Sequence, residues 1–190
     1  MIGLKREEVT LHEHQKEWSE NAKTIINNLK NVFGDTAIDI QHIGSTAIQN
    51  IKAKPMLDIA VAVNTFDDLP IIFPLLEKIG IYKSTLQPLP GDILCAVKNN
   101  RESDICLSAV HIVLIDSLQW KNYVNFRDYM NAFPQKAKEY EKLKIDLAQQ
   151  YPHDRKAYSN GKKQFIERML LEAKEFAKNY TKAAKQMRRS

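Results

Sequence analysis

One segment of the chain combines a turn suited to phosphate binding with an acidic strand. Gly44 and Ser45 follow a stretch in which apolar and polar residues alternate, and Asp58 lies inside an apolar run shortly after them. Small residues in a turn let backbone N–H groups approach phosphate oxygens, and a nearby carboxylate can hold Mg²⁺ against the same phosphates. The segment therefore indicates binding of a nucleotide or another phosphorylated small molecule.

The acidic strand carries only half of the carboxylate pair typical of polymerase-β-type nucleotidyltransferases. A second acid on the same face would stand two positions after Asp58, and that position is Ala60. One carboxylate can hold Mg²⁺ when phosphates and waters complete the octahedron, whereas two or three are usual in a two-metal mechanism. Two functions therefore stay open: metal-dependent nucleotidyl transfer, and a catalytically inactive ligand-binding or regulatory module.

Asp58 has a structural interpretation beside the catalytic one, because it could cap a neighbouring backbone or end the sheet. An acid inside an apolar strand costs several kcal/mol unless it is paired or metal-bound. Its candidate partners are a divalent cation, Lys54 before the strand, or a cationic helix residue.

Two histidines are candidates to complete a metal site. His111 is flanked by Val110 and Ile112, and His42 lies two residues before the Gly-Ser turn. Each could instead be a histidine satisfied in the core or at a sheet edge. An Asp/His set suits Zn²⁺ or Mn²⁺ better than Mg²⁺, which favours oxygen ligands. We expect a divalent metal (Mg²⁺, Mn²⁺ or Zn²⁺) at Asp58, His111 and His42, with Asp58 and His111 as the catalytic residues.

Length and composition describe an ordinary globular protein. The chain has 190 residues, of which 44% are hydrophobic and 27% charged. No apolar run approaches the roughly 20 residues that cross a bilayer, and the N-terminus lacks a signal-peptide pattern. Two cysteines without metal-ligand spacing argue against a disulfide scaffold or structural zinc. We expect a cytoplasmic protein without a membrane partner.

Positive charge is concentrated in the last third of the chain. Residues 1–120 contain 11 Lys and Arg against 15 Asp and Glu, a net −4, and residues 121–190 contain 17 against 8, a net +9. Solvated helices would explain this pattern, and so would helices that present cations to a phosphate. We do not expect a nucleic-acid partner, because basic residues alternate with acids. An RNA-binding tail is a further alternative, and it would use Lys182, Lys185, Arg188 and Arg189.

Hydrophobic periodicity separates a mixed first part from a helical second part. Helices are predicted over 14–33, 67–79, 118–130, 134–149 and 154–180, and strands over 37–43, 56–63, 92–98 and 105–115. Pro74 should shorten or kink the second helix, and Asn99-Asn100 should form a tight turn. The expected fold class is α+β, with a mixed sheet of about four strands, flanking helices and a three-helix C-terminal bundle.

The same pattern suggests how the chain is organised. Residues 1–116 should form the α/β core, and residues 117–190 a helical region packed on it that ends in the basic tail. No internal repeat or low-complexity linker divides them, so we expect one domain overall.

Several motifs in succession resemble the GrpB family, which is placed by similarity in the nucleotidyltransferase superfamily and is sometimes fused to dephospho-CoA kinase. The resemblance covers about residues 9–170 and is carried by His42-Ile43-Gly44-Ser45-Thr46-Ala47, Ala53-Lys54-Pro55 with Asp58-Ile59, His111-Ile112-Val113, Phe126-Arg127-Asp128-Tyr129, Tyr140 with Leu143-Lys144, and Asp154-Arg155 with Tyr158, Lys162 and Phe165. It implies a nucleotidyltransferase-like fold.

The chain departs from the family pattern at two places. Ile48-Gln49-Asn50 replaces the usual Val-Pro-Gly after the Gly-Ser-Thr-Ala run, and Ser108-Ala109-Val110 occupies a stretch where members commonly carry additional histidines. These departures bear on metal binding more than on the fold.

The family positions in the basic third suggest a clamp for an anionic ligand. Arg127 could grip phosphate or carboxylate with its planar fork, or it could form an ion pair with another helix residue. Spacings of three and four place Arg155, Tyr158 and Lys162 on one helix face, which could point at the Gly-Ser turn or at solvent. We expect the substrate-binding residues to be Gly44, Ser45, Lys54, Arg127, Lys144, Arg155, Tyr158 and Lys162.

Overall fold

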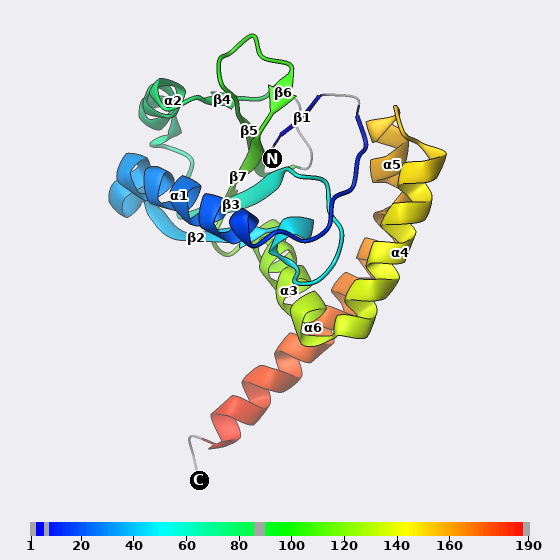
Figure 1. Ribbon diagram of the computed structural model, residues 1–190. Helices are drawn as coiled ribbons and strands as arrows, with labels where there is room; N and C mark the ends of the chain where they lie inside the picture. The colour runs from blue at the N-terminus through cyan, green and yellow to red at the C-terminus, as the bar shows by residue number, and fades with distance from the viewer. Residues whose placement is uncertain (1–2, 6–7, 86–89, 188–190) are drawn as a thin grey trace.

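The computed structural model describes residues 3–5, 8–85 and 90–187, and the side chains of 179–187 lie outside that description. The four basic tail side chains that we considered for RNA binding are therefore not described. The elements in chain order are β1 Leu4–Lys5, α1 Lys16–Phe33, a 3-10 turn Gly34–Thr36, β2 Ala37–Ile43, a 3-10 turn Ser45–Ala47, β3 Leu57–Val63, α2 Leu69–Lys78, β4 Ile81–Lys83, β5 Asp92–Val97, β6 Ile105–Cys106, β7 Ser108–Leu114, α3 Leu118–Ala132, α4 Pro134–Gln150, α5 Arg155–Gly161 and α6 Lys163–Met187 (Figure 1).

A five-stranded mixed sheet forms the centre of the fold, in the order β2-β3-β7-β5-β4. Strands β3 and β7 are parallel, while the other neighbouring pairs are antiparallel. Strands β1 and β6 form a separate antiparallel pair. Both neighbours of β3 are therefore strands, and β3 has no free edge.

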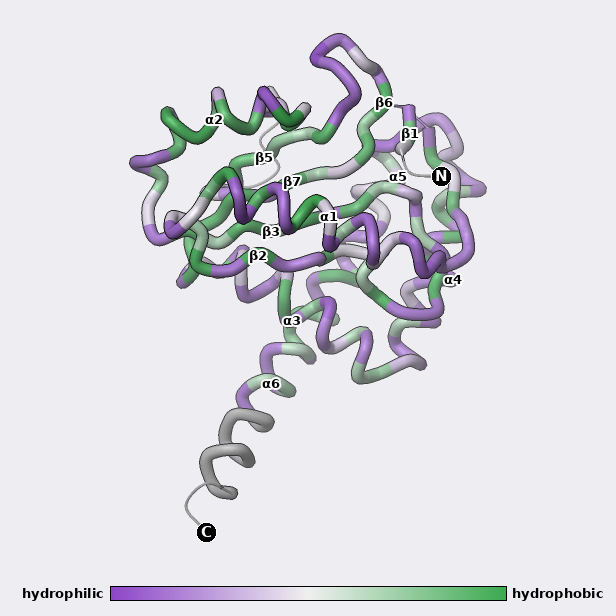
Figure 2. Tube along the Cα trace, turned by 60° about the vertical axis from the view of Figure 1, so that its left-hand side comes forward, coloured by the Kyte–Doolittle hydropathy of each residue, from purple (hydrophilic) through white to green (hydrophobic). Residues whose placement is uncertain are grey.

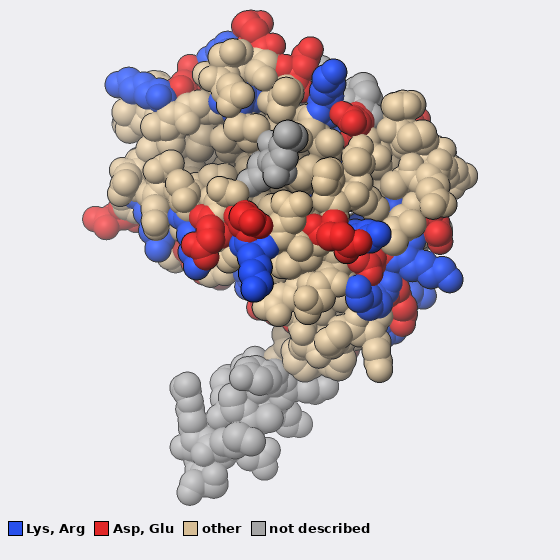
Figure 3. Space-filling model, viewed as in Figure 1, with Lys and Arg blue, Asp and Glu red and all other residues tan. Residues whose placement is uncertain are grey.

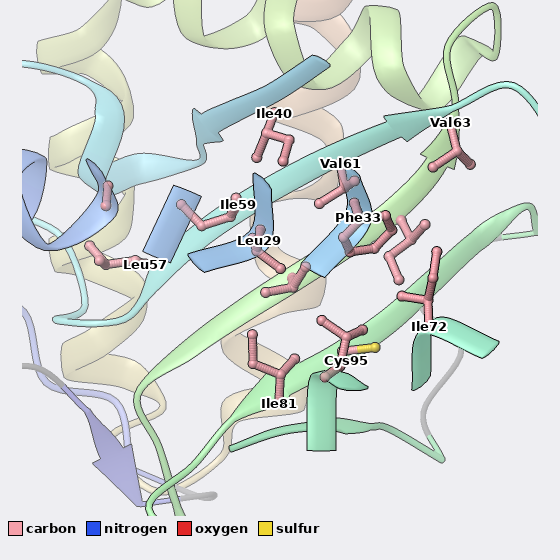
Figure 4. Close-up of a cluster of buried hydrophobic side chains, with 14 of the residues drawn as sticks. Leu29, Phe33, Ile40, Leu57, Ile59, Val61, Val63, Ile72, Ile81 and Cys95 are labelled. Carbon is pink, nitrogen blue, oxygen red and sulfur yellow. The ribbon is translucent and has the colours of Figure 1, made fainter. Parts of the chain in front are cut away.

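Helices cover both faces of the sheet, which explains why β3 is almost continuously apolar. On one face, side chains of α1 and α2 pack against alternate residues of β3; Figure 4 shows this cluster, which includes Leu29, Phe33, Ile72, Leu57, Ile59 and Val61. On the other face, Ala60 and Ala62 pack against Trp120 of α3. The hydropathy colouring of Figure 2 shows the resulting apolar strands between the helices.

The C-terminal helices pack against the loop that follows the Gly-Ser turn. Ile48 and Ile51 of that loop lie in one buried cluster with Tyr140 of α4 and Met169 of α6. Asn131 of α3 also donates a hydrogen bond to the carbonyl of Ala47. The basic helices are thereby fixed next to the turn rather than projecting away from it.

Local sequence signals explain where several helices begin. Ser117 accepts a hydrogen bond from the backbone N–H of Trp120, and Asp154 accepts one from Ala157, so each serves as an N-cap. Pro134 stands at the first position of α4, where its missing N–H is tolerated. Within the described ranges no helix is long and apolar enough to cross a membrane.

The α+β class and the mixed sheet with flanking helices are confirmed. Helix α2 is short, as Pro74 predicts, and Pro74 lies inside it without a break. Three details differ from expectation. The sheet has a fifth strand, β4, which is too short to show a period. Strands β5 and β7 are joined by a ten-residue connection that contains β6, so Asn99-Asn100 is not a tight hairpin turn. The last predicted helix is split at Lys162 into α5 and α6, which gives four C-terminal helices instead of three.

Candidate functional site

The Gly-Ser turn and the acidic strand are in direct contact. Gly44 directly follows β2 and has φ 70° and ψ −169°, a conformation that glycine adopts more readily than other residues. A Cβ added to Gly44 would lie 2.3 Å from Oδ2 of Asp58, because antiparallel pairing sets the adjacent Ile43 opposite Asp58. Only a glycine lets the backbone approach the carboxylate this closely.

Strand register gathers three polar side chains on the sheet face that α3 covers. Ala60 of β3 lies opposite His111 of β7, so His111 shares the face of Asp58. In the next pair, Leu94 lies opposite His111 and Asp92 opposite Val113, which places Asp92 of β5 on the same face. A histidine from β7 and an acid from β5 thus stand beside Asp58, where β3 itself offers only Ala60.

His111 lies between the two carboxylates. Its Nδ1 is 2.9 Å from Oδ2 of Asp92, and its Nε2 is 4.0 Å from Oδ1 of Asp58. Tyr123 of α3 donates a hydrogen bond to the same Asp92 oxygen at 2.5 Å. The exposed side-chain fraction rises from 0% for Asp92 through 13% for His111 to 28% for Asp58, so the chain of contacts leads from the interior toward solvent.

The neighbouring carboxylates raise the pKa of His111 despite its burial. Burial by itself would lower the pKa of His111, but the hydrogen bond and charge of Asp92, together with the charge of Asp58, outweigh burial and raise it. Burial and Asp92 raise the pKa of Tyr123, which keeps its hydroxyl protonated as a donor. Asp92 was not among the sequence-predicted site residues, because an acid at the first position of a strand gives no local sign of burial.

A cationic cluster is formed by Lys54, Lys144, Arg155 and Lys162 around two tyrosines. The ammonium groups of Lys54 and Lys162 lie 5.1 Å and 4.6 Å from the ring centroid of the buried Tyr158. Lys144 is buried; its ammonium lies 4.7 Å from the ring centroid of Tyr140 and donates to the carbonyl of Lys52. The loop before β3, helix α4, helix α5 and the α5–α6 junction therefore each contribute one cation to the cluster.

In the described part of the chain, the cationic cluster forms no ion pair with a carboxylate. Among the described residues, no Asp or Glu oxygen lies within the 4.0 Å ion-pair distance of any of its four members. Burial, followed by the charges of Arg155 and Lys162, lowers the pKa of Lys54 to about 7. Burial, followed by the charge of Lys162, likewise lowers the pKa of Lys144 to about 7. The fold thus confines mutually repelling cations in a poorly hydrated place.

The cationic cluster lies next to the Gly-Ser turn. Ser45 donates a hydrogen bond to the hydroxyl of Tyr140 at 3.4 Å, and Tyr140 underlies the ammonium of Lys144. The charge of Asp58 also acts on Lys54. The structure therefore brings together most predicted substrate-binding positions (Gly44, Ser45, Lys54, Lys144, Arg155, Tyr158, Lys162) beside Asp58 and His111.

Two predicted site residues, His42 and Arg127, are placed differently. His42 pairs opposite Ile59, which directs it to the face opposite Asp58, and its Nε2 lies 2.9 Å from the hydroxyl of Thr46. Arg127 donates to the side chain of Gln41 and to the carbonyl of His42, and it pairs with Asp128, so it ties α3 to β2. His42 does not join Asp58 and His111.

The donor set fits a divalent metal only as a two-residue site. Asp58 and Nε2 of His111 converge, and the other ring nitrogen of His111 is bonded to a carboxylate, as is usual for metal-binding histidines. The described part of the chain contains no group of three or more His, Cys, Asp or Glu arranged to hold a metal. An Asp/His pair suits Mn²⁺ or Zn²⁺ better than Mg²⁺.

Known proteins resemble this chain over most of its length. The model of the GrpB protein family matches residues 8–172. The glutamate-rich protein GrpB of Alkalihalophilus pseudofirmus is 35% identical over 173 residues, 90% of this chain and 99% of the relative.

Solved structures also resemble this chain in fold. The crystal structure of the conserved protein GrpB from Enterococcus faecalis has a TM-score of 0.79 at 28% identity and covers 88% of this chain and 99% of its own. The Cid1 poly(U) polymerase with Mg 3'-dATP bound has a TM-score of 0.52 at 14% identity, covering 80% of this chain and 49% of that one. This second likeness shows a nucleotidyltransferase-like fold alone.

Replacing Gly44 with alanine should destabilise the protein more than an alanine elsewhere at positive φ. At Gly44 the new Cβ meets Asp58, and we expect a loss of about 2–4 kcal/mol from backbone strain and overpacking. Gly34→Ala is the matched control, because Gly34 has φ 51° and nothing within 4 Å of an added Cβ. Urea unfolding measures the free energy of unfolding of both variants. Equal losses in the two variants would show that contact with Asp58 does not constrain the turn.

His42→Gln should reduce the acid sensitivity of the fold. Burial, then the charges of Arg127 and His14, lower the pKa of His42 to about 4, so the unfolded chain binds the proton more readily than the folded one. The contribution of His42 to the free energy of unfolding is therefore lost as pH falls from about 6.5 to about 4, and the loss is up to about 3 kcal/mol. Glutamine can still bond Thr46 but does not titrate; unfolding curves with the same pH dependence as wild type would contradict the assignment.

Proposed function

The chain belongs to the GrpB family, and from that premise we propose that it binds a nucleotide or another phosphorylated small molecule between the Gly-Ser turn and the cationic cluster. The observation that carries this proposal is the cationic cluster itself. Two of its lysines have lowered pKa values, and none of its four members forms an ion pair with a described carboxylate. An anion bound there would offset their mutual repulsion.

Each part of the site has a distinct task in binding. The turn at Gly44 and Ser45 lets backbone approach phosphate oxygens. Lys54, Arg155 and Lys162 would neutralise the phosphate charge, while the buried Lys144, over the ring of Tyr140, would add to the positive potential of the site. Figure 3 shows acidic and basic side chains interspersed over the face in view, which suits a local small-molecule site better than a nucleic-acid track on that face.

The finer activity that we propose is metal-dependent nucleotidyl transfer. Asp58 and His111 would hold Mn²⁺, Zn²⁺ or Mg²⁺, which when bound polarises a phosphoryl oxygen. In such a transfer an acceptor oxygen forms a bond to the α-phosphorus while the bond to the pyrophosphate oxygen breaks, and the acceptor proton passes to a base. The cationic cluster would stabilise the departing pyrophosphate.

A binding module without catalysis is the alternative, and a specific observation favours it. Ala60 removes the same-face acid of β3, and the described residues offer a metal two ligands rather than three. Loss of a metal ligand can abolish most turnover while the phosphate pocket stays intact. Such a protein would sense or sequester its ligand.

Lys162→Met should weaken nucleotide binding about tenfold or more, because a charged hydrogen bond contributes roughly 1.5–3 kcal/mol. Calorimetric titration with ATP in the presence of Mn²⁺ measures the affinity. Lys163→Met is the matched control, since the neighbouring Lys163 is exposed and pairs with Glu167 at 3.9 Å; its affinity should stay within twofold of wild type. Absence of binding by the wild type, or equal weakening in both variants, would remove the proposed pocket.

Pyrophosphate release separates the enzyme from the binding module. With nucleoside triphosphates, Mn²⁺ and a mixture of hydroxyl acceptors, nucleotidyl transfer should release pyrophosphate, and Asp58→Asn should reduce the rate at least 100-fold by weakening metal binding. Tight nucleotide binding without release in the wild type would instead support the module. Release that persists in Asp58→Asn would exclude the metal role of Asp58.

A further inference from the structure

Asp92 is a buried carboxylate that the binding roles above do not use. Its side chain has no exposed surface, and both donors that reach it, Nδ1 of His111 and the hydroxyl of Tyr123, reach the same oxygen, Oδ2. The other oxygen, Oδ1, is buried without a hydrogen-bond partner among the described residues. A buried carboxylate is costly unless it is paired, so Asp92 depends on these two contacts.

That dependence restrains His111 in return. If the imidazole rotated away, Asp92 would lose one of these two donors, and Oδ1 has no partner among the described residues to compensate. A carboxylate accepts but cannot donate, so the contact at 2.9 Å requires the proton on Nδ1. The ring nitrogen left for the pocket is then Nε2, which lies 4.0 Å from Asp58.

We propose that Asp92 is a positioning residue that fixes the tautomer and orientation of His111, so that Nε2 faces Asp58 as the second ligand of the divalent-metal site. This inference deepens the proposed function and rests on it, because it assigns the metal to the Asp58–His111 pair. It also explains how a site with Ala60 in β3 can hold a metal: β5 supplies a supporting carboxylate behind the histidine of β7.

Tyr123 has a secondary part in the same arrangement. Its hydroxyl lies 3.2 Å from Nδ1 of His111 but 2.5 Å from Asp92, so its hydrogen bond is to the carboxylate. Removing this hydroxyl leaves the contact between Asp92 and His111 in place. Tyr123 therefore provides a control that perturbs the same buried oxygen without removing the acceptor that fixes the tautomer.

The first test is a nitrogen NMR spectrum of His111 in the metal-free wild-type protein at pH 8, which needs neither ligand nor variant. Long-range ¹⁵N–¹H correlations distinguish the two ring nitrogens. A proton on Nδ1 is the expected result. A bare Nδ1 with the proton on Nε2 would overturn the assignment of Asp92.

The second test measures Mn²⁺ affinity of the full chain by calorimetry for wild type, Asp92→Val and Tyr123→Phe. Loss of a supporting carboxylate typically costs 10- to 100-fold in metal affinity, and we expect that range for Asp92→Val. We expect Tyr123→Phe to lose less Mn²⁺ affinity than Asp92→Val, because it leaves the contact between Asp92 and His111 in place. The proposal would be overturned if folded Asp92→Val bound Mn²⁺ within twofold of the wild-type affinity. It would also be overturned if Tyr123→Phe lost as much Mn²⁺ affinity as Asp92→Val.

The two tests keep the two proposals separable. A wild type that binds nucleotide but no Mn²⁺ would end the metal role of Asp58 and His111 and with it the positioning role of Asp92, while the phosphate pocket would stand. Mn²⁺ binding that Asp92→Val weakens, with no nucleotide binding, would uphold Asp92 and reject the pocket. If Asp92→Val fails to fold, the spectrum of the wild type decides.

Discussion

The register of β3 against β7 is the constraint on which the candidate site depends. Parallel pairing sets Ala60 opposite His111, and antiparallel pairing of β7 with β5 brings Asp92 to the same face. Because side chains alternate along a strand, a slip of one residue would turn His111 toward α1 and leave Asp58 alone. The apolar residues between these positions, packed on both faces by helices, make such a slip costly.

The charged groups of the candidate site come from two parts of the fold. The sheet supplies its acids and its histidine, and the segments around the sheet supply its cations. Lys54 comes from the loop before β3, while Lys144, Arg155 and Lys162 come from the C-terminal helices that pack on the turn's own loop through Ile48 and Ile51. The same packing that completes the hydrophobic cluster therefore delivers the positive charge to the Gly-Ser turn. Three of the basic residues behind the net charge of +9 in residues 121–190 therefore lie at the candidate site.

Sequence patterns predicted the elements that have a clear period and missed features that depend on pairing between distant segments. Helix α1, strands β2 and β3 and the Gly-Ser turn follow from spacing and from Gly44 itself. Strand β4 was missed because three residues cannot show alternation. Asp92 has no local mark of burial; only the pairing of β5 with β7 places it behind His111. His42 and Asp58 were expected together because both flank the turn, yet pairing of His42 with Ile59 separates their faces. Lys144 was recognised through the family resemblance, but its burial depends on how α4 lies against the loop at Lys52.

A crystal structure of the protein with Mn²⁺ and a non-hydrolysable nucleoside triphosphate would test the central claim most directly, because anomalous scattering locates the metal independently of the ligand. The account predicts a manganese peak beside Asp58 and Nε2 of His111, with the phosphates between the turn at Gly44 and Ser45 and the ammonium of Lys162. Manganese bound away from Asp58, or phosphates bound outside the cationic cluster, would contradict it.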